Sequence, residues 1–236
     1  MKKFAALVAA VLLVTTAPAF AMYLGEIQFR SIPWEYSLPY FGGAFQQEIG
    51  IDNEKLRLRY EDNFSGVSYT DVITKSIKIL DGQDVPFYSI MFNTTGMLDV
   101  AEYPVRYVSI LAIPQKPVED VNTDWHQSTV YSAEYTFSLE KGKEDEAYKA
   151  LKAKLTAVYG ECDYQAEIDF GEMIKDLKGI TIYHDVWIGL NNTSVILWHE
   201  GEKSSSKSVS VIYQRTDVDR LIAAYKAAAV GDTSGL

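Results

Sequence analysis

Cysteine and histidine are scarce in this chain, and each scarcity limits its chemistry. Cys162 is the single cysteine among 236 residues, so no disulfide can form within the chain and the core alone must hold the fold together. Three histidines leave few nucleophile–base pairs. The sequence has no G-x-S-x-G elbow, H-E-x-x-H pair, Walker-A loop, G-x-G-x-x-G turn or EF-hand loop. It therefore carries no local signature of catalysis, and we expect no cofactor.

The setting of Cys162 disfavours a reactive thiolate. Glu161 precedes this cysteine and Asp163 follows it, and negative neighbours raise the pKa of a thiol. We therefore expect a buried or idle thiol rather than a catalytic nucleophile.

Positive charge is also in short supply. The sequence has 22 Lys and Arg residues against 32 Asp and Glu residues, a formal net charge of −10. An acidic chain repels phosphate backbones and anionic lipid surfaces, so we expect neither nucleic acid nor a membrane surface as its partner. After the N-terminus no apolar run reaches the roughly 20 residues that span a bilayer, which argues against membrane insertion of the mature protein.

The first 21 residues are typical of a secretory signal peptide. Lys2 and Lys3 form a basic start, residues 4–14 form an apolar run, and Ala19 and Ala21 form a small-x-small cleavage site. No cysteine follows the apolar run, which argues against a lipid anchor. We expect a mature chain that starts at residue 22, has a net charge of −12 and is secreted or periplasmic.

Alternation of apolar and polar residues with a period of two predicts antiparallel strands along most of the remaining chain. These segments are short, and most are bounded by Gly, Pro, Asp or Asn. The predicted strands are 55–60, 76–80, 87–92, 105–113, 130–139, 180–188, 195–199 and 208–213.

Three longer segments have helical spacing instead. Residues 144–159 repeat apolar residues on one face, with acidic residues first and lysines later, as the helix dipole favours. Residues 218–229 follow suitable capping residues, and a third helix is expected to begin at Ser37. A short helical turn is expected over 171–177.

These elements predict an α+β fold with a mainly antiparallel sheet and two or three amphipathic helices packed on one face, because strands and helices do not alternate strictly. We expect residues 22–230 to form one domain, followed by a flexible tail over 231–236. The polar, turn-rich segment 116–125 is expected to be a loop or a boundary between two subdomains.

Two of the three histidines flank a predicted hairpin over 179–201, GITIYHDVWIGLNNTSVILWHEG. With a two- or four-residue turn centred on 191–192, His184 lies opposite His199, and side chains about 5 Å apart at Cβ could share a metal ion. A three-residue turn shifts the register by one and removes the pair. We expect the two histidines to have a structural role; a metal or catalytic role is the alternative.

Aromatic residues gather near the expected mature N-terminus, at Trp34, Tyr36, Tyr40 and Phe41. Aromatic surfaces suit carbohydrate, peptide or protein partners, so these four residues form the candidate binding site. Core packing is the alternative explanation for them.

Two stretches resemble exported bacterial α+β proteins of uncharacterised families. The segment IPWEYSLPYF is similar to the opening that precedes the first helix of such proteins, and AYKALKAKLTAVYG, DVWIGLNNTSVILWHEG and VSVIYQ resemble their later pattern. These are packing motifs, so the resemblance implies a fold and export. A weaker likeness to the helix-on-sheet modules of β-lactamase-inhibitor proteins and envelope-assembly lipoproteins implies protein binding, although the paired cysteines and the lipidation cysteine are missing.

We therefore expect an exported protein without catalytic activity that binds another protein or an extracellular polymer such as a glycan. The alternative is a hydrolase or metal-dependent enzyme that uses the hairpin of His184 and His199.

Overall fold

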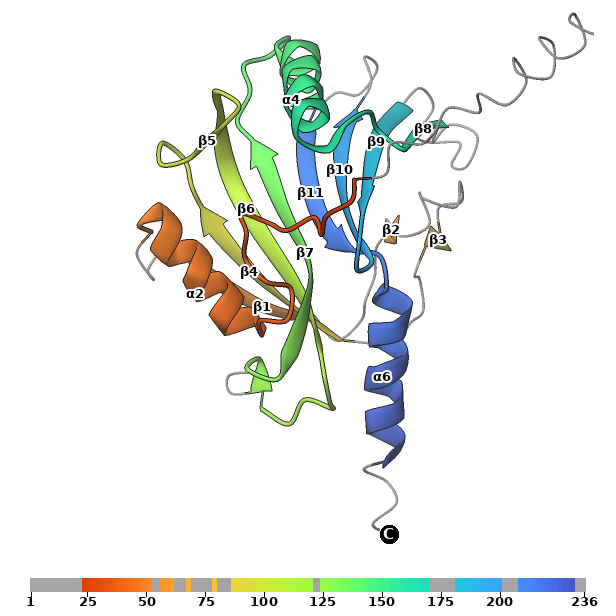
Figure 1. The fold of residues 1–236 in the computed structure, drawn as a ribbon. Helices are drawn as coiled ribbons and strands as arrows, with labels where there is room; N and C mark the ends of the chain where they lie inside the picture. Colours follow the sequence, from red (N-terminus) through yellow and green to blue (C-terminus); the bar gives the residue numbers. More distant parts are fainter. Residues whose placement is uncertain are drawn as a thin grey trace, which may run out of the picture.

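A computed structural model describes residues 23–51, 56–61, 67–68, 78–79, 86–120, 124–169, 181–200 and 208–231 (Figure 1). The predicted signal peptide, the predicted turn over 171–177 and residues 232–236 of the predicted tail lie outside the described residues. Within the described ranges, no helix is both long and apolar enough to cross a membrane.

One antiparallel sheet dominates the structure, in the strand order β1-β4-β6-β7-β11-β10-β9-β8, with β5 paired to β6. An α+β fold with a mainly antiparallel sheet is therefore confirmed. The strands are β1 (Leu56–Glu61), β4 (Phe87–Asn93), β5 (Asp99–Val100), β6 (Tyr103–Pro114), β7 (Ser128–Phe137), β8 (Tyr164–Asp169), β9 (Thr181–Gly189), β10 (Thr193–Glu200) and β11 (Val209–Arg215), and a separate hairpin is formed by β2 (Val67–Ser68) and β3 (Lys78–Ile79).

The three predicted helices are present as α2 (Leu38–Ile49), α4 (Glu144–Tyr159) and α6 (Val218–Gly231). Helix α4 has the predicted bounds, and three acidic residues in its first turn complement the helix dipole. Helix α2 begins after Ser37, with a proline in its first turn, and ends at Gly50, whose φ of 67° lies in the left-handed region. Helix α6 extends to the first residue of the predicted tail.

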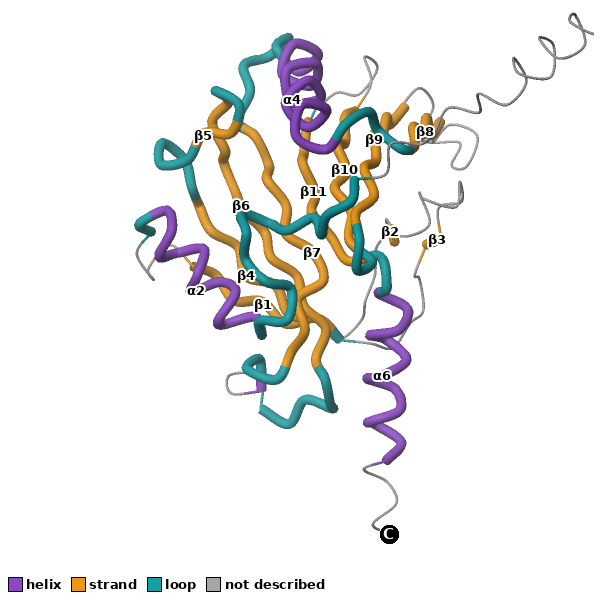
Figure 2. Tube along the Cα trace, viewed as in Figure 1, coloured by secondary structure: helices purple, strands orange, loops and turns teal. Residues whose placement is uncertain are grey.

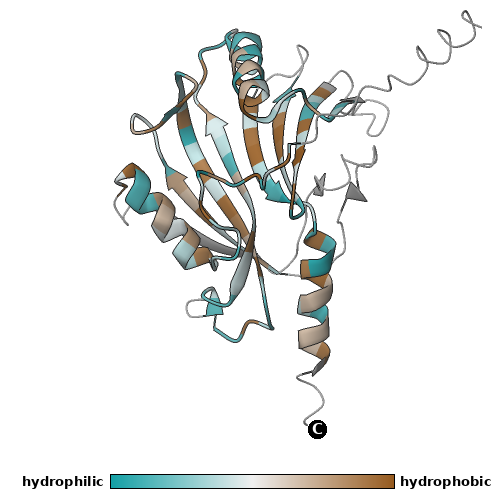
Figure 3. Cartoon of the chain, viewed as in Figure 1, coloured by the Kyte–Doolittle hydropathy of each residue, from teal (hydrophilic) through white to brown (hydrophobic). Residues whose placement is uncertain are grey.

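Helices pack on both faces of the sheet, and Figure 1 shows α6 extending past the end of β11. Helices α2 and α4 bury apolar side chains such as Phe41 and Leu151 in one large cluster with strand residues including Ile90 and Ile110. Helix α6 buries Val218 and Ile222 against the opposite face. The expected packing of two or three amphipathic helices on one face is thus met by α2 and α4, while α6 packs on the other face. Figure 3 shows the core as brown stretches along the central strands.

The predicted loop over 116–125 lies in the connection between β6 and β7, which are neighbours in the same sheet. Strand β7 also pairs with β11, so hydrogen-bonded strands continue on both sides of this connection. The segment therefore links two adjacent strands of a continuous sheet.

The topology repeats itself once along the chain. A first unit contains α2, β1, β4, β6 and β7, and a second contains α4, β8, β9, β10 and β11; each is a helix followed by a four-stranded meander. The units meet at the antiparallel pair of β7 and β11. Tyr135 and Tyr213 occupy equivalent places in this pair, pack edge to face at 6.1 Å and both contact Phe29. The two meanders therefore share one aromatic centre.

The segment 23–36, here called the N-terminal strap, crosses the sheet face between α2 and α4 (Figure 2). Buried side chains Ile27, Phe29 and Trp34 fix it to the core. It is also hydrogen-bonded to the turn between β9 and β10, because Leu190 N donates to Gly25 O at 2.8 Å and Ile27 N donates to Thr193 Oγ1 at 2.9 Å. The strap thus connects the β9–β10 turn with the part of the sheet that α2 covers.

Close packing of the strap makes Gly189 sensitive to substitution. A Cβ atom at this position would lie 2.7 Å from Ile27 Cγ1 and 2.8 Å from the Gly25 carbonyl oxygen. We expect Gly189→Ala to lower the free energy of unfolding by about 1–3 kcal/mol, because overpacking displaces backbone here. Chemical denaturation monitored by tryptophan fluorescence measures the change.

Gly43 provides the matched control for this prediction. It is exposed in the middle of α2, and a Cβ there would meet no atom within 4 Å. Gly43→Ala should stabilise the protein by about 0.5–1 kcal/mol, because alanine favours a helix. Equal effects of the two alanine substitutions would show that the strap is not packed against Gly189.

Candidate functional site

The β9–β10 hairpin has the three-residue turn, not the two- or four-residue turn. Gly189 pairs with Thr193, and Asn191 and Asn192 both have φ of 56°, in the left-handed region that asparagine tolerates. His184 consequently pairs with Trp198, and His199 pairs with Tyr183. Successive strand residues point to opposite faces, so the cross-strand pair of His184 and His199, which required a two- or four-residue turn, does not form.

The two histidines have different surroundings. His199 lies under α4, where its Nε2 is 2.9 Å from Asp145 Oδ1 and its ring packs 5.0 Å from that of Tyr148. His184 lies on the other face, in the strand register of the apolar cluster of Val186 and Ile196, and burial lowers its pKa to about 4. Among the described residues no three His, Cys, Asp or Glu side chains gather into a possible metal site.

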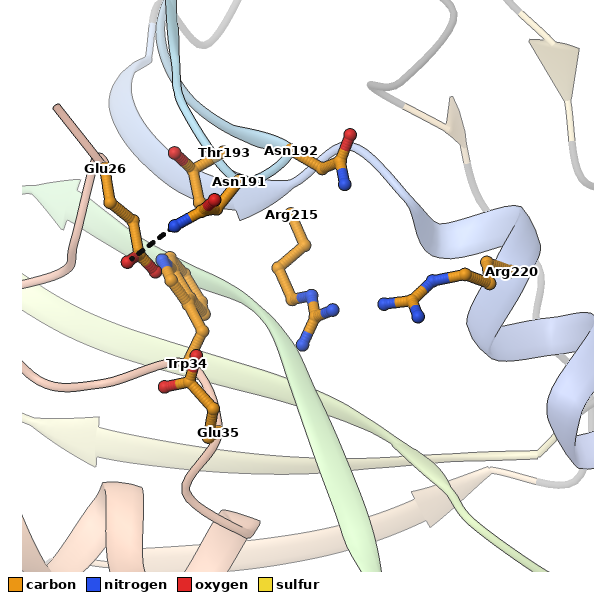
Figure 4. Close-up of a pocket in the computed structure, with 8 residues that line it drawn as sticks. All are labelled: Glu26, Trp34, Glu35, Asn191, Asn192, Thr193, Arg215 and Arg220. Atoms are coloured by element: carbon orange, nitrogen blue, oxygen red, sulfur yellow. Dashed lines mark hydrogen bonds between the residues drawn. The ribbon is translucent and has the colours of Figure 1, made fainter. Parts of the chain in front are cut away.

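A polar pocket lies where the strap meets the β9–β10 turn and the start of α6 (Figure 4). Its volume is about 230 Å³. The strap contributes Glu26, Trp34 and Glu35, the turn and β10 contribute Asn191, Asn192 and Thr193, and β11 and α6 contribute Arg215 and Arg220. Three segments distant in sequence therefore build one site.

Two guanidinium groups form one side of the pocket. Arg215 donates through Nε and Nη2 to the two carboxylate oxygens of Asp217, both at 2.9 Å. Arg220 donates from its Nε to Asp217 Oδ2 at 2.8 Å. Although burial alone would raise it, hydrogen bonds from both arginines hold the pKa of Asp217 below its usual value. The shared carboxylate therefore holds the two cations beside each other. Figure 4 draws the two arginine side chains on the same side of the pocket.

Acidic and aromatic side chains of the strap form the other side. Glu26 accepts a hydrogen bond of 3.4 Å from Asn191 Nδ2, and Glu35 extends from the residue after Trp34. Trp34 is buried, and its indole N–H donates to Ile27 O at 2.8 Å, which fixes the ring as a wall. The pocket thus has carboxylates on the strap side and guanidinium groups on the β11 and α6 side (Figure 4).

The four predicted aromatic binding residues separate into two pairs. Trp34 and Phe41 are buried, with ring centroids 5.6 Å apart, and Phe41 stacks on Phe29. Tyr36 is 44% exposed and Tyr40 is 71% exposed. Core packing therefore accounts for Phe41, whereas Trp34 serves both the core and the pocket and the two tyrosines face solvent.

A second polar cluster, here called the α4 clasp, ties α4 to the sheet at the buried carboxylate of Asp185. Lys152 Nζ donates to Asp185 Oδ1 at 2.8 Å, Gln165 Nε2 donates to the same oxygen at 2.7 Å, and Tyr148 donates its hydroxyl hydrogen to Oδ2. Cys162 Sγ lies 3.7 Å from Oδ1. The donors are used within the cluster, so its geometry is that of a structural brace.

Cys162 has the raised thiol pKa predicted from its neighbours, but the cause is different. Burial contributes most, and the Asp185 carboxylate follows. The flanking residues Glu161 and Asp163 are not among the causes of the shift. Asp163 accepts a hydrogen bond from Ile188 N at 2.8 Å. A neutral thiol is therefore part of the α4 clasp.

Comparison of this chain with protein-family models, with curated proteins and with solved structures finds no match.

Proposed function

We propose that the chain is an exported, non-catalytic protein that binds another protein or an extracellular polymer at the strap. The single observation that carries the proposal is the polar pocket beside exposed aromatic residues. Tyr36 follows directly on Glu35, a pocket residue, and Tyr40 lies one helical turn further along. Tyrosine and tryptophan supply large contact area with few rotatable bonds, which favours binding.

The pocket residues are held in place before any ligand arrives. Asp217 fixes both arginines, Asn191 contacts Glu26, and the core fixes Trp34. Side chains that are already ordered lose little conformational entropy on binding. A preorganised polar site next to solvent-facing tyrosines supports a binding role, and the signal-peptide pattern of residues 1–21 supports export.

The tyrosines provide the test of this proposal. Glycan and peptide arrays probed with the purified protein should give a saturable binder, and the double substitution Tyr36→Ala with Tyr40→Ala should weaken it by roughly 10- to 30-fold. Tyr183→Ala is the matched control, because Tyr183 is also exposed but lies seven residues along β9 from the turn. Equal loss in both variants, or no binder on either array, would refute the proposal.

A further inference from the structure

The geometry points to a zwitterionic ligand group for the pocket, one that carries a carboxylate and an ammonium together, as amino acids and peptide ends do. This inference rests on the proposed binding function and specifies its chemistry. It is drawn from the arrangement of charges on the two sides of the pocket.

The arginine side offers hydrogen-bond donors to a carboxylate. Asp217 engages Nε and Nη2 of both Arg215 and Arg220. For the third nitrogen, Nη1 of each arginine, the described part of the chain provides no acceptor within hydrogen-bond distance. Arginine N–H groups bind carboxylates strongly because the hydrogen bonds are charge-assisted. The two guanidinium groups share Asp217 and line the same pocket, so together they can receive one carboxylate of a ligand.

The strap side offers acceptors to an ammonium group. Glu26 and Glu35 both line the pocket, and the hydrogen bond that Glu26 accepts from Asn191 is long, at 3.4 Å. Together with Asp217, the site has three carboxylates against two guanidinium groups, a formal charge of −1. A simple anion would meet repulsion from Glu26 and Glu35, and a simple cation would meet repulsion from the arginines. A ligand with both charges satisfies both sides.

The volume limits what can enter. The pocket volume of about 230 Å³ lies below the roughly 300–1,000 Å³ of pockets that hold drug-sized ligands. That is room for an amino acid or for the end of a chain, but not for an extended polymer. A larger partner would therefore insert one end or one side group against Trp34.

A series of linear ω-amino acids, from glycine to 6-aminohexanoate, tests this inference by isothermal titration calorimetry. Hexanoate and hexylammonium are the matched compounds that carry one charge each. At least one zwitterion should bind saturably, and each single-charge compound should bind at least about tenfold more weakly, because either loss removes a charge-assisted contact.

Substitutions in the protein provide the second arm. Arg220→Gln and Glu26→Gln should each weaken the zwitterion at least about tenfold. The Arg220 side chain is 70% exposed, so its substitution should leave the fold intact, in contrast to Arg215, whose side chain is 15% exposed. Arg106→Gln is the control, because Arg106 lies over the ring of Tyr107 on β6 and not in the pocket.

Each other result overturns the inference. Hexanoate that binds as tightly as the zwitterions would make the pocket an anion site, and hexylammonium that does so would make it a cation site. Absence of binding by the whole series would exclude a zwitterion. None of these results affects the array experiment with Tyr36 and Tyr40, so failure of the ligand class and failure of the binding function can be told apart.

Discussion

The free energy of unfolding should fall by about 3–5 kcal/mol when Asp185 is replaced by alanine, because the substitution removes a buried carboxylate that accepts hydrogen bonds from three side chains. The Asp185 side chain is only 2% exposed. It accepts from Lys152 and Gln165 and from the hydroxyl of Tyr148, whose pKa is raised above its usual value by burial and by this carboxylate. Loss of these contacts would also release α4 from β9.

Denaturant unfolding of Asp185→Ala and Asp185→Asn measures the effect. The asparagine keeps the shape and one acceptor, so it should lose less stability than the alanine. Lys143→Ala is the control, because Lys143 and Glu146 form an exposed pair at 2.7 Å, and such pairs contribute about 0–1 kcal/mol. If Asp185→Ala were as mild as Lys143→Ala, the α4 clasp would not stabilise the fold.

Acid should destabilise the protein through His184 by up to about 3 kcal/mol. Burial lowers the pKa of His184 from 6.5 to about 4 in the folded chain. Above pH 6.5 the imidazole is neutral in both the folded and the unfolded chain, so its titration does not change the free energy of unfolding. Between pH 6.5 and about 4 the unfolded chain binds a proton that the folded chain does not. Stability is therefore lost as the pH falls through this range, by about 1.4 kcal/mol for each pH unit.

Comparison of the native protein with His184→Gln isolates this contribution. The difference in unfolding free energy between the two should change with pH across this window and level off on either side. Glu134, whose pKa burial raises, is present in both proteins, so its titration cancels. His126→Gln is the control, because His126 is exposed and should leave the pH dependence unchanged. A pH-independent difference for His184→Gln would contradict the prediction.

Helices and most strands could be predicted because their signals are local. In α4, acidic residues at the start and apolar residues at helical spacing fix both ends and the buried face. Strand β8 was missed. Its sequence, YQAEID, is polar because it pairs only with β9 and lies at the end of the sheet, where apolar alternation is not required.

The register of the β9–β10 hairpin could not be decided from its sequence. Asn191 and Asn192 indicate a turn, but turns of two, three or four residues all suit them. The strap decides between these turns. Leu190 forms a parallel bridge with Glu26 and donates to Gly25 O, so this residue belongs to the turn and not to the β9–β10 ladder. A contact from 165 residues away therefore determines which face each histidine occupies.

The pocket was beyond sequence reasoning for the same reason. Glu26 and Arg215 have no local sign of a shared site, because only the crossing of the strap brings them together. One local signal was available. Arg215, Asp217 and Arg220 surround the predicted start of α6, and this spacing allows both arginines to reach one carboxylate. Of the four aromatic residues proposed for binding, only Trp34 lines the pocket.

The join between the two helix-and-meander units has a consequence for synthesis of the protein. The ribosome completes β7 well before β11, which comes last among the strands that the structure describes. Until residues 209–215 emerge, β7 has a partner on one side only, although it will lie in the middle of the finished sheet. An unpaired strand edge is a template for pairing with another chain. The nascent protein is therefore most exposed to aggregation just before β11 is made.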